Sequence, residues 1–338
     1  MYRCRFLNYG LYIAEYTIQH CHLSSHSPEA RQNNYIMDYD GTQKIDWDYV
    51  FNLKKSLAEQ MKNGDIPSFC KGCHWIEEYD ENTAEPLPEN RIGIVWIGNT
   101  NKCNCRCTYC NAYEKLKNKE YTKGFDLLPL FKEMLDKKIF IPNEQISNWF
   151  GGSRASFGYG EPTISPRFND LIKFFYKHNI NDISVYSNGI VFSKPLADCL
   201  KSKEIDMNLV ISIDSGTRET YKKIKEVDAF KKVCDSIKKY VQAAKHDKVE
   251  KVQIKYIILP GINDSKEEID KWFDICVNKL GVKSLSADVE ETWYINNKDS
   301  IPQHIIDLCI YIKDLAKKNS DIRFEYYDRI EMIGLKDS

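Results

Sequence analysis

The sequence predicts an α/β fold with a parallel sheet, preceded by a small cysteine-rich domain. From Arg91 onward, short runs of β-branched and other apolar residues alternate with longer amphipathic patterns, an order typical of βα units. The expected strands cover 92–97, 155–159, 183–186, 208–213, 252–259 and 284–289. The expected helices cover 125–137, 166–177, 195–202, 218–246, 266–280 and 301–318. Six such units are too few to close an eight-stranded barrel of the TIM type.

The first ninety residues have a different pattern. Leu11–Ile13 and Tyr16–Ile18 predict a short hairpin, and Trp47–Lys62 has apolar residues at helical spacing, with Gly64 after it. Residues 81–89 contain two prolines among acidic side chains, which is typical of a polar linker. We therefore expect one domain over residues 1–90 and a second over residues 91–338.

Composition excludes several function classes. The net charge of −1 predicts no binding to nucleic acid or to an anionic membrane. The N-terminus has no apolar segment typical of a signal peptide, and no run approaches the length of about 18 apolar residues that a membrane span needs. The twelve cysteines are therefore expected to serve as thiolate metal ligands in a reducing, cytoplasmic compartment rather than as a disulfide framework.

The densest chemical signal is a group of four cysteines within eight residues, directly after the first strand of the α/β part. Cys103, Cys107 and Cys110 have the spacing C-x3-C-x2-C, and Cys105 lies between the first two. Thiolates this close repel one another, and a soft metal or an iron–sulfur cluster removes that repulsion. A zinc site usually has four protein ligands, so three ligands indicate a cluster with one iron left open. A zinc loop is the alternative.

With Tyr109 placed before the last cysteine, this spacing resembles the signature of the radical S-adenosylmethionine (SAM) superfamily. The resemblance implies that Cys103, Cys107 and Cys110 hold a four-iron, four-sulfur cluster. It also implies that the open iron takes the amino and carboxylate groups of SAM, with Tyr109 nearby. The expected fold is then a partial (β/α)6 barrel over roughly residues 91–330, open on one side for substrate.

Segments at the ends of the next two expected strands are similar to SAM-binding segments of this family. Gly160, Glu161 and Pro162 match three residues of its Gly-Gly-Glu-Pro stretch, which contacts the SAM amino group. Ser187 and Asn188, followed by a glycine, are similar to its Thr/Ser-Asn-Gly segment near SAM. Glycines allow close backbone approach to a ligand, and a carboxylate accepts hydrogen bonds from an ammonium.

The fourth and fifth expected strands end in further similar segments. Ser212 and Asp214 resemble the Ser-x-Asp stretch of the family, which implies that Ser212 reaches the SAM ribose. Family members often have an arginine a few residues later for the SAM carboxylate. Here that place is taken by a lysine, either Lys223 or Lys225, which supplies charge but no bidentate fork. Asn263 follows the fifth strand, in a loop expected above the adenine.

A second set of cysteines lies in the N-terminal ninety residues. Cys4 precedes the expected hairpin, Cys21 follows it, and Cys70 and Cys73 form a C-x2-C pair after the helix. The layout resembles the SPASM or twitch modules of radical SAM enzymes, which implies a second, auxiliary four-iron, four-sulfur cluster. A structural zinc site is the alternative, with His20, His22 or His74 as further ligands, and unliganded cysteines are another.

The resemblance implies an oxidoreductase-type enzyme that receives an electron from a reductant such as flavodoxin or ferredoxin. The enzyme then cleaves SAM to a 5′-deoxyadenosyl radical that abstracts hydrogen from substrate. An auxiliary cluster suits a net oxidation. Carboxylate and aromatic side chains in 288–294 suit a small molecule such as a sugar or amino sugar. Peptide modification of the maturase type, epimerisation, and a non-catalytic zinc-stabilised α/β binding protein are the alternatives.

Overall fold

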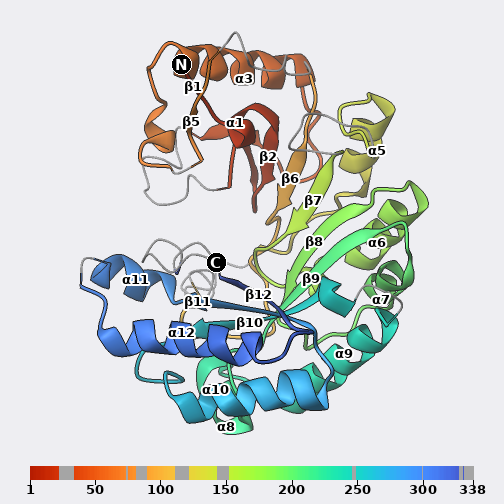
Figure 1. The fold of residues 1–338 in the computed structure, drawn as a ribbon. Helices are drawn as coiled ribbons and strands as arrows, with labels where there is room; N and C mark the ends of the chain where they lie inside the picture. The colour runs from red at the N-terminus through yellow and green to blue at the C-terminus, as the bar shows by residue number, and fades with distance from the viewer. Residues whose placement is uncertain are drawn as a thin grey trace. The chain divides into compact units, whose positions relative to one another are not determined.

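The computed structural model describes residues 1–22, 34–73, 75–80, 90–110, 122–142, 152–245, 249–298, 300–326 and 330. The chain forms two compact units, each made of several stretches. The first unit contains Met1–Lys102, Thr122–Gly160 and Ser165–Ser184. The second unit contains Cys103–Tyr121, Glu161–Ile164 and Val185–Ser338. Helices and strands are labelled in Figure 1.

The sheet of the first unit has the strand order β7-β6-β2-β3-β4. These strands are β2 (Gly10–Ile13), β3 (Thr17–Gln19), β4 (Tyr35–Asp38), β6 (Ile94–Ile97) and β7 (Arg154–Phe157). β2 pairs in parallel with β6, β6 pairs in parallel with β7, and β3 pairs antiparallel with both β2 and β4. The predicted hairpin is confirmed as β2–β3, and it extends the sheet that contains β6. The domain boundary near residue 90 stays a prediction.

The helices of the first unit pack on this sheet and on a small two-stranded ribbon. They are α1 (Arg5–Tyr9), α3 (Trp47–Lys62), the 3₁₀ helix η1 (Ser68–Cys70), α5 (Leu128–Asp136) and α6 (Phe168–Lys177), and the ribbon pairs β1 (Tyr2–Arg3) with β5 (Glu77–Glu78). α3 has the predicted bounds. The Asp46 side chain caps its N-terminus by accepting a hydrogen bond from Tyr49 N, and Gly64 follows its end with φ of 87°.

The strands of the second unit form a parallel sheet with the order β12-β11-β10-β9. They are β9 (Asp206–Ser212), β10 (Val252–Ile258), β11 (Ser284–Val289) and β12 (Arg323–Tyr326), and β8 (Asp182–Ser187) passes from the first unit into the second. Its helices are α7 (Lys194–Lys201), α8 (Arg218–Lys225), α9 (Phe230–Ala243), α10 (Lys266–Phe273), α11 (Glu291–Asn297) and α12 (Gln303–Lys317). Short helical turns cover Pro162–Ile164, Val249–Lys251 and Asp274–Lys279. Parallel strands that alternate with helices confirm the predicted fold class.

One face of this sheet is apolar and the other is polar. Tyr256 of β10 packs against Trp272 of α10 with ring centroids 4.9 Å apart, and α9 and α12 contact β10 and β11 (Figure 1). Because side chains alternate along a strand, Gln253 and Lys255 point to the opposite face. The parallel register places Ser284 and Ser286 of β11 beside them. The helices therefore bury the apolar face, and the polar face carries side chains able to bind a ligand.

The helix predicted over 218–246 is wrong, because the structure divides it into α8 and α9. Glu226 ends α8 in the left-handed conformation, with φ of 50°. The next residues turn back so that Asp228 accepts two hydrogen bonds from the Arg218 guanidinium. The sequence pattern also missed α11 and β12, which are short. Within the described residues, no helix is long and apolar enough to span a bilayer.

Gly216 allows the turn after β9 to approach α10 closely. A Cβ at this position would lie 2.4 Å from Trp272 N and 2.5 Å from Glu268 O. We therefore expect Gly216→Ala to lower the free energy of unfolding by about 3 kcal/mol, as overpacking against backbone does. Gly261→Ala is the control, because nothing lies within 4 Å of its Cβ and only its left-handed φ of 81° opposes the change. It should cost about 1 kcal/mol. Equal losses in urea-induced unfolding would contradict the close approach.

Candidate functional site

The cysteine loop, Cys103–Cys110, is anchored to the last turn of α8. Arg106 N donates to Lys225 O at 3.0 Å, and Thr108 N donates to Ile224 O at 2.9 Å. Cys110 N donates to Cys107 O at 3.0 Å, which closes a tight turn between these two cysteines. Backbone hydrogen bonds therefore fix the path of the loop within the second unit.

The sulfur atoms in this loop interact with one another. The buried Cys105 thiol forms hydrogen bonds with the sulfurs of Cys103 and Cys107, which raises the pKa of Cys105. The hydrogen bond between Cys105 and Cys103 holds the pKa of Cys103 below its ordinary value, and Cys105 N also donates to Cys103 Sγ at 3.3 Å. The hydrogen bond between Cys105 and Cys107 lowers the pKa of Cys107 to about 7, with the positive charge of Lys225 acting in the same direction. The thiolate, which is the form that binds metal, is therefore reached more easily at Cys103 and Cys107 than at an ordinary cysteine.

These donors suit an iron–sulfur cluster. Three half-buried thiols share one short loop, and two of them favour the thiolate. Among the described residues, no group of three or more His, Cys, Asp or Glu side chains is arranged to hold a single metal ion. A four-iron cluster does not need three side chains to meet at one metal atom, because each cysteine thiolate binds a different iron.

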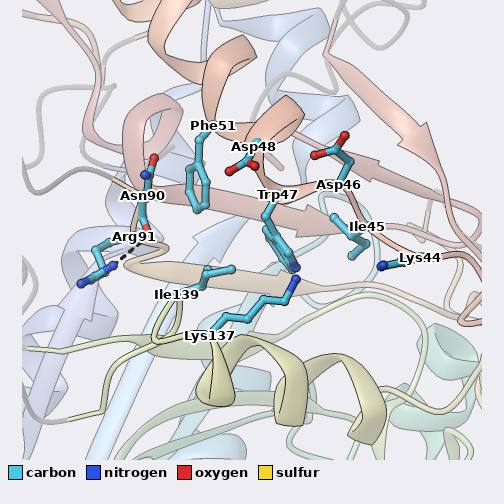
Figure 2. Close-up of a pocket in the computed structure, with 10 residues that line it drawn as sticks. All are labelled: Lys44, Ile45, Asp46, Trp47, Asp48, Phe51, Asn90, Arg91, Lys137 and Ile139. Carbon is cyan, nitrogen blue, oxygen red and sulfur yellow. Dashed lines mark hydrogen bonds between the residues drawn. The ribbon is translucent and has the colours of Figure 1, made fainter.

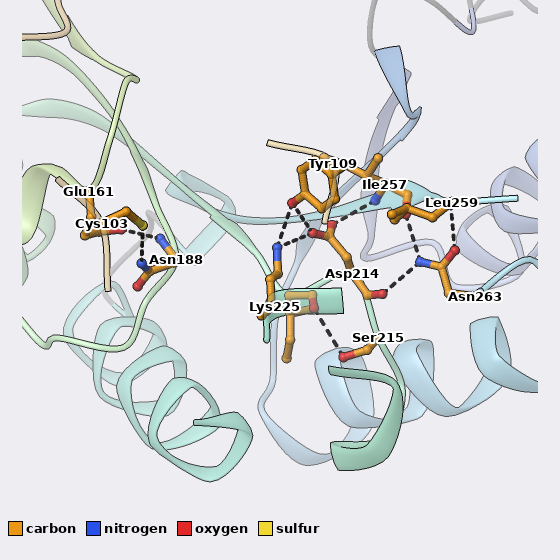
Figure 3. Close-up of polar contacts among 11 residues, drawn as sticks. Cys103, Tyr109, Glu161, Asn188, Asp214, Ser215, Lys225, Ile257, Leu259 and Asn263 are labelled. Atoms are coloured by element: carbon orange, nitrogen blue, oxygen red, sulfur yellow. Dashed lines mark hydrogen bonds and ion pairs between the residues drawn. The ribbon is translucent and has the colours of Figure 1, made fainter. Parts of the chain in front are cut away.

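On the Cys103 side of the loop, a buried carboxylate organises two predicted residues (Figure 3). Glu161 accepts hydrogen bonds from Ser187 Oγ at 2.8 Å, from Asn188 N at 2.7 Å and from Thr163 Oγ1 at 2.5 Å. Burial raises the pKa of Glu161, and these three donors oppose that shift. The Asn188 side chain donates to Asn104 Oδ1 at 2.6 Å and reaches Cys103 Sγ at 3.5 Å. Glu161, Ser187 and Asn188 therefore lie together beside the first cysteine.

Gly160 and Pro162 flank this carboxylate along the chain. Gly160 belongs to the first unit and has φ of 64°, and a Cβ there would lie 2.4 Å from Thr100 O. Only glycine fits this approach to the segment that leads into the cysteine loop. Pro162 is buried and begins a 3₁₀ turn that carries Thr163 toward Glu161.

On the other side of the loop, Tyr109, Asp214 and Lys225 form a buried network (Figure 3). Tyr109 OH donates to Asp214 Oδ2 at 2.7 Å, Lys225 Nζ donates to Tyr109 OH at 2.7 Å, and Lys225 and Asp214 form an ion pair. The Lys225 and Asp214 side chains are only 2% and 0% exposed. Burial opposes the charged form of Lys225, but Asp214 and Cys107 hold its pKa above the ordinary value. The network ties the loop to the end of β9.

Asn263 joins the ends of two strands beneath this network. Its amide donates to Asp214 O at 2.9 Å and to Ile257 O at 2.8 Å, and its Oδ1 accepts from Leu259 N at 2.7 Å. Ile257 N in turn donates to Asp214 Oδ1 at 2.8 Å. Asp214 has φ of 53°, a left-handed conformation that non-glycine residues seldom adopt outside functional or tightly held positions. Sequence reasoning placed Asn263 in a loop and missed this bracing role.

The second unit thus brings together most of the predicted site residues. Ser212 is the last residue of β9 and lies in register with Lys255 of β10. Lys225 donates to Tyr109 and Asp214, so its predicted contact with a SAM carboxylate stays a prediction. The predicted roles of the other residues likewise stay predictions.

The four N-terminal cysteines lie in one region of the first unit. Cys4 precedes α1, Cys21 follows β3, and Cys73 N donates to Cys70 O at 3.0 Å, which closes the C-x2-C turn. Burial raises the pKa of Cys70, and the charges of Cys4, Cys21 and Cys73 raise it further. Burial and the Cys73 charge likewise raise the pKa of Cys4. The four thiols are therefore near enough to interact electrostatically.

Two histidines near Cys21 are neutral. Burial lowers the pKa of His20 to about 2 and that of His22 to about 3. His20 stacks on Phe69 with ring centroids 6.1 Å apart, and the ring centroids of His22 and Trp96 are 4.0 Å apart. A neutral imidazole is the form that can bind a metal, and ligation by either histidine stays a prediction. His74 lies outside the described residues.

A separate hollow of about 610 Å³ opens in the first unit between the start of α3 and the end of α5 (Figure 2). Its lining includes the acidic Asp46 and Asp48 and the basic Lys44, Arg91 and Lys137. Trp47 Nε1, on its wall, donates to Glu133 at 3.0 Å. The hollow contains none of the predicted site residues.

We expect Lys225→Met to lower the free energy of unfolding by about 3–5 kcal/mol, because it leaves the buried Asp214 carboxylate unpaired. Lys222→Met is the control, since Lys222 is exposed on the same helix, and it should cost less than about 0.5 kcal/mol. Lys225→Met combined with Asp214→Asn removes the unpaired charge and should recover part of the loss. Urea-induced unfolding followed by circular dichroism measures all three variants. A double variant no more stable than Lys225→Met would contradict the ion-pair explanation.

Comparison with known proteins places the chain in a family. Two curated relatives are similar over most of its length. The probable GTP 3′,8-cyclase of Saccharolobus solfataricus is 25% identical over 254 residues, which is 75% of this chain and 68% of the relative. The GTP 3′,8-cyclase of Clostridium botulinum strain Okra is 26% identical over 253 residues, which is 72% of this chain and 73% of the relative.

The crystal structure of Streptococcus suis SuiB bound to precursor peptide SuiA has a similar fold, with a TM-score of 0.50 and 16% identity. The alignment covers 82% of this chain and 62% of SuiB, so this chain spans less than two thirds of that protein. The family model of the radical SAM superfamily matches residues 99–273, which include the cysteine loop and the ends of β7 to β10. Because this match spans more than half of the 338 residues, the chain belongs to the radical SAM superfamily.

Proposed function

We propose that this enzyme holds a four-iron, four-sulfur cluster on Cys103, Cys107 and Cys110 and uses it to cleave SAM and abstract hydrogen from a small polar substrate. When bound, the cluster and SAM supply the 5′-deoxyadenosyl radical, and the protein binds, orients and shields the reactants. The observation that carries this proposal is the loop itself. It offers three thiols, two of them with lowered pKa, between two buried polar networks.

The protein groups around the loop have distinct tasks in this proposal. The Asn188 side chain reaches both Cys103 and Asn104, so a molecule bound beside the first cysteine meets this amide and the carboxylate of Glu161 behind it. A buried carboxylate with raised pKa suits an ammonium group, which would restore its charged form. Ser187 donates to Glu161 and so orients it, and Ser212, the last residue of β9, would serve the ribose.

The side chains on the polar face of the second unit's sheet favour a substrate rich in hydroxyl or amino groups. Lys255 Nζ lies 3.0 Å from Asp288 Oδ2; the lysine side chain is 12% exposed and the aspartate 1%, and the pair offers donors and an acceptor. Ser286 lies beside Lys255 in register, and its hydroxyl is buried with no hydrogen-bond partner among the described residues. Gln253 Nε2 donates to Glu325 at 3.0 Å on the same face. These groups suit a sugar or amino sugar, and the auxiliary cysteines suit its net oxidation.

A second candidate is a nucleotide or peptide substrate. The relatives named GTP 3′,8-cyclase favour a purine nucleotide, and the peptide-bound SuiB structure favours peptide modification. On the described polar face, however, the cations Lys255 and Arg323 are paired with Asp288 and Glu325. A triphosphate would need unpaired cations there, so the small neutral or amino substrate is preferred. The reductant in all cases would be a protein such as flavodoxin or ferredoxin.

Iron and sulfide content of anaerobically reconstituted protein, measured with SAM cleavage under reductant, tests the function. About eight irons per chain with cleavage would support both clusters, because a four-thiolate and a three-thiolate cluster each hold about four. About four irons with cleavage would support the Cys103–Cys110 site alone. Zinc without cleavage would overturn the proposal.

The two sets of cysteines should respond differently to substitution. Cys107→Ala should abolish formation of 5′-deoxyadenosine, because the cluster that reduces SAM loses a ligand. Cys73→Ala should keep uncoupled cleavage but lose product, because only the auxiliary site is damaged. Cys199→Ala is a matched control, since this buried cysteine lies in α7, away from both sets along the chain. Complete loss of cleavage in both Cys107→Ala and Cys73→Ala would argue against separate clusters.

Lys255→Met tests the polar face. With a responding sugar substrate, we expect KM to rise about tenfold or more, since a hydrogen bond to a charged group contributes about 1.5–3 kcal/mol. Cleavage of SAM without substrate, measured per folded protein, should stay near the wild-type rate, although the buried Asp288 carboxylate left unpaired should lower the free energy of unfolding. Lys283→Met is the control, because Lys283 is partly exposed just before β11. An unchanged KM in Lys255→Met would remove this face from substrate recognition.

A further inference from the structure

Lys54 is a buried lysine in the first unit. It lies on α3 and is 3% exposed. Its ammonium donates to Leu7 O at 2.9 Å and also to Gly10 O. Leu7 belongs to α1 and Gly10 begins β2, so one side chain holds the end of a helix and the start of a strand. Because Cys4 directly precedes α1, Lys54 also fixes the backbone that carries the first N-terminal cysteine.

No carboxylate balances this charge within the described residues, because the hydrogen bonds of Lys54 go to the two carbonyl oxygens. Burial lowers the pKa of Lys54 to about 7, and negative charge on Cys21 and Cys4 opposes that shift. Burying an ammonium without a counter-ion is strongly unfavourable, and carbonyl dipoles compensate only part of the lost hydration. Protonated thiols would leave the charge unbalanced, whereas metal-bound thiolates would balance it.

A second feature nearby also lacks a partner. His20 is 2% exposed, and its Nδ1 has no hydrogen-bond partner among the described residues. It directly precedes Cys21, and it stacks on Phe69, which directly precedes Cys70. The positive charge of Lys54 acts on this imidazole too. A buried polar atom with no partner, beside two of the four cysteines, indicates that another group is bound there.

We propose that Lys54 is the positioning residue and counter-ion of an auxiliary iron–sulfur cluster held by Cys4, Cys21, Cys70 and Cys73. This inference rests on the proposed function, from which it takes the auxiliary cluster. Such a cluster with four thiolate ligands carries net negative charge, and its reduction potential depends on nearby charge and hydrogen bonds. Lys54 therefore makes the cluster easier to reduce and holds Cys4 in place through α1.

The test uses full-length protein in which Cys103, Cys107 and Cys110 are replaced by alanine, so that only the N-terminal cluster remains. In this background, Lys54→Gln keeps an amide donor for the carbonyls but removes the charge, and Lys54→Arg keeps the charge. Lys55→Gln is the matched control, because Lys55 is the exposed neighbour on the same helix. Iron content and the reduction potential, from a titration followed by electron paramagnetic resonance, are measured for each variant.

We expect the background protein to bind about four irons per chain. Lys54→Gln should shift the potential to more negative values or lose iron from folded protein, Lys54→Arg should restore the background potential, and Lys55→Gln should leave it unchanged. If the background protein binds no iron, the proposal of an auxiliary cluster is overturned, and the proposed role of Lys54 is overturned with it. If the cluster is present but Lys54→Gln and Lys55→Gln have the same potential and iron content, only the role of Lys54 is overturned.

Discussion

The buried ion pair between Lys225 and Asp214 is the interaction on which the candidate site depends. It joins the cysteine loop, through Tyr109 OH, to the end of β9. A buried pair contributes little net stability, because the desolvation of two charges offsets most of their attraction. Its effect is positional. Neither partner can leave without exposing the other as an unpaired charge, so the loop, α8 and the ends of β9 and β10 keep one arrangement.

The two units share a physical pattern, although each is described by itself. In the second unit a buried lysine, Lys225, lowers the pKa of Cys107 by its charge. In the first unit another buried lysine, Lys54, lies within electrostatic range of Cys4 and Cys21. Lysine is seldom fully buried unless it is paired. Both lysines would gain a counter-ion if the thiols near them bound a cluster, because binding of a cluster requires the thiolate form.

Much of the architecture was predictable from sequence because it depends on local patterns. Apolar runs and helical periodicity located the parallel strands, and the spacing of Cys103, Cys107 and Cys110 located the loop that the family match includes. Features set by distant contacts were not predictable in this way. The pairing of β2 with β6 joins segments about eighty residues apart, and the break between α8 and α9 falls at Glu226, whose left-handed φ no local pattern indicated. The brace at Asn263 likewise depends on backbone groups from two strands.

The most direct test of the account is the electron paramagnetic resonance spectrum of the reduced protein with and without SAM. If Cys103, Cys107 and Cys110 hold a cluster with an open iron, adding SAM should change the spectrum of the reduced wild-type protein. The spectrum of Cys107→Ala should not respond to SAM. A wild-type protein that gives no iron–sulfur signal, or a signal that SAM leaves unchanged, would contradict the central claim.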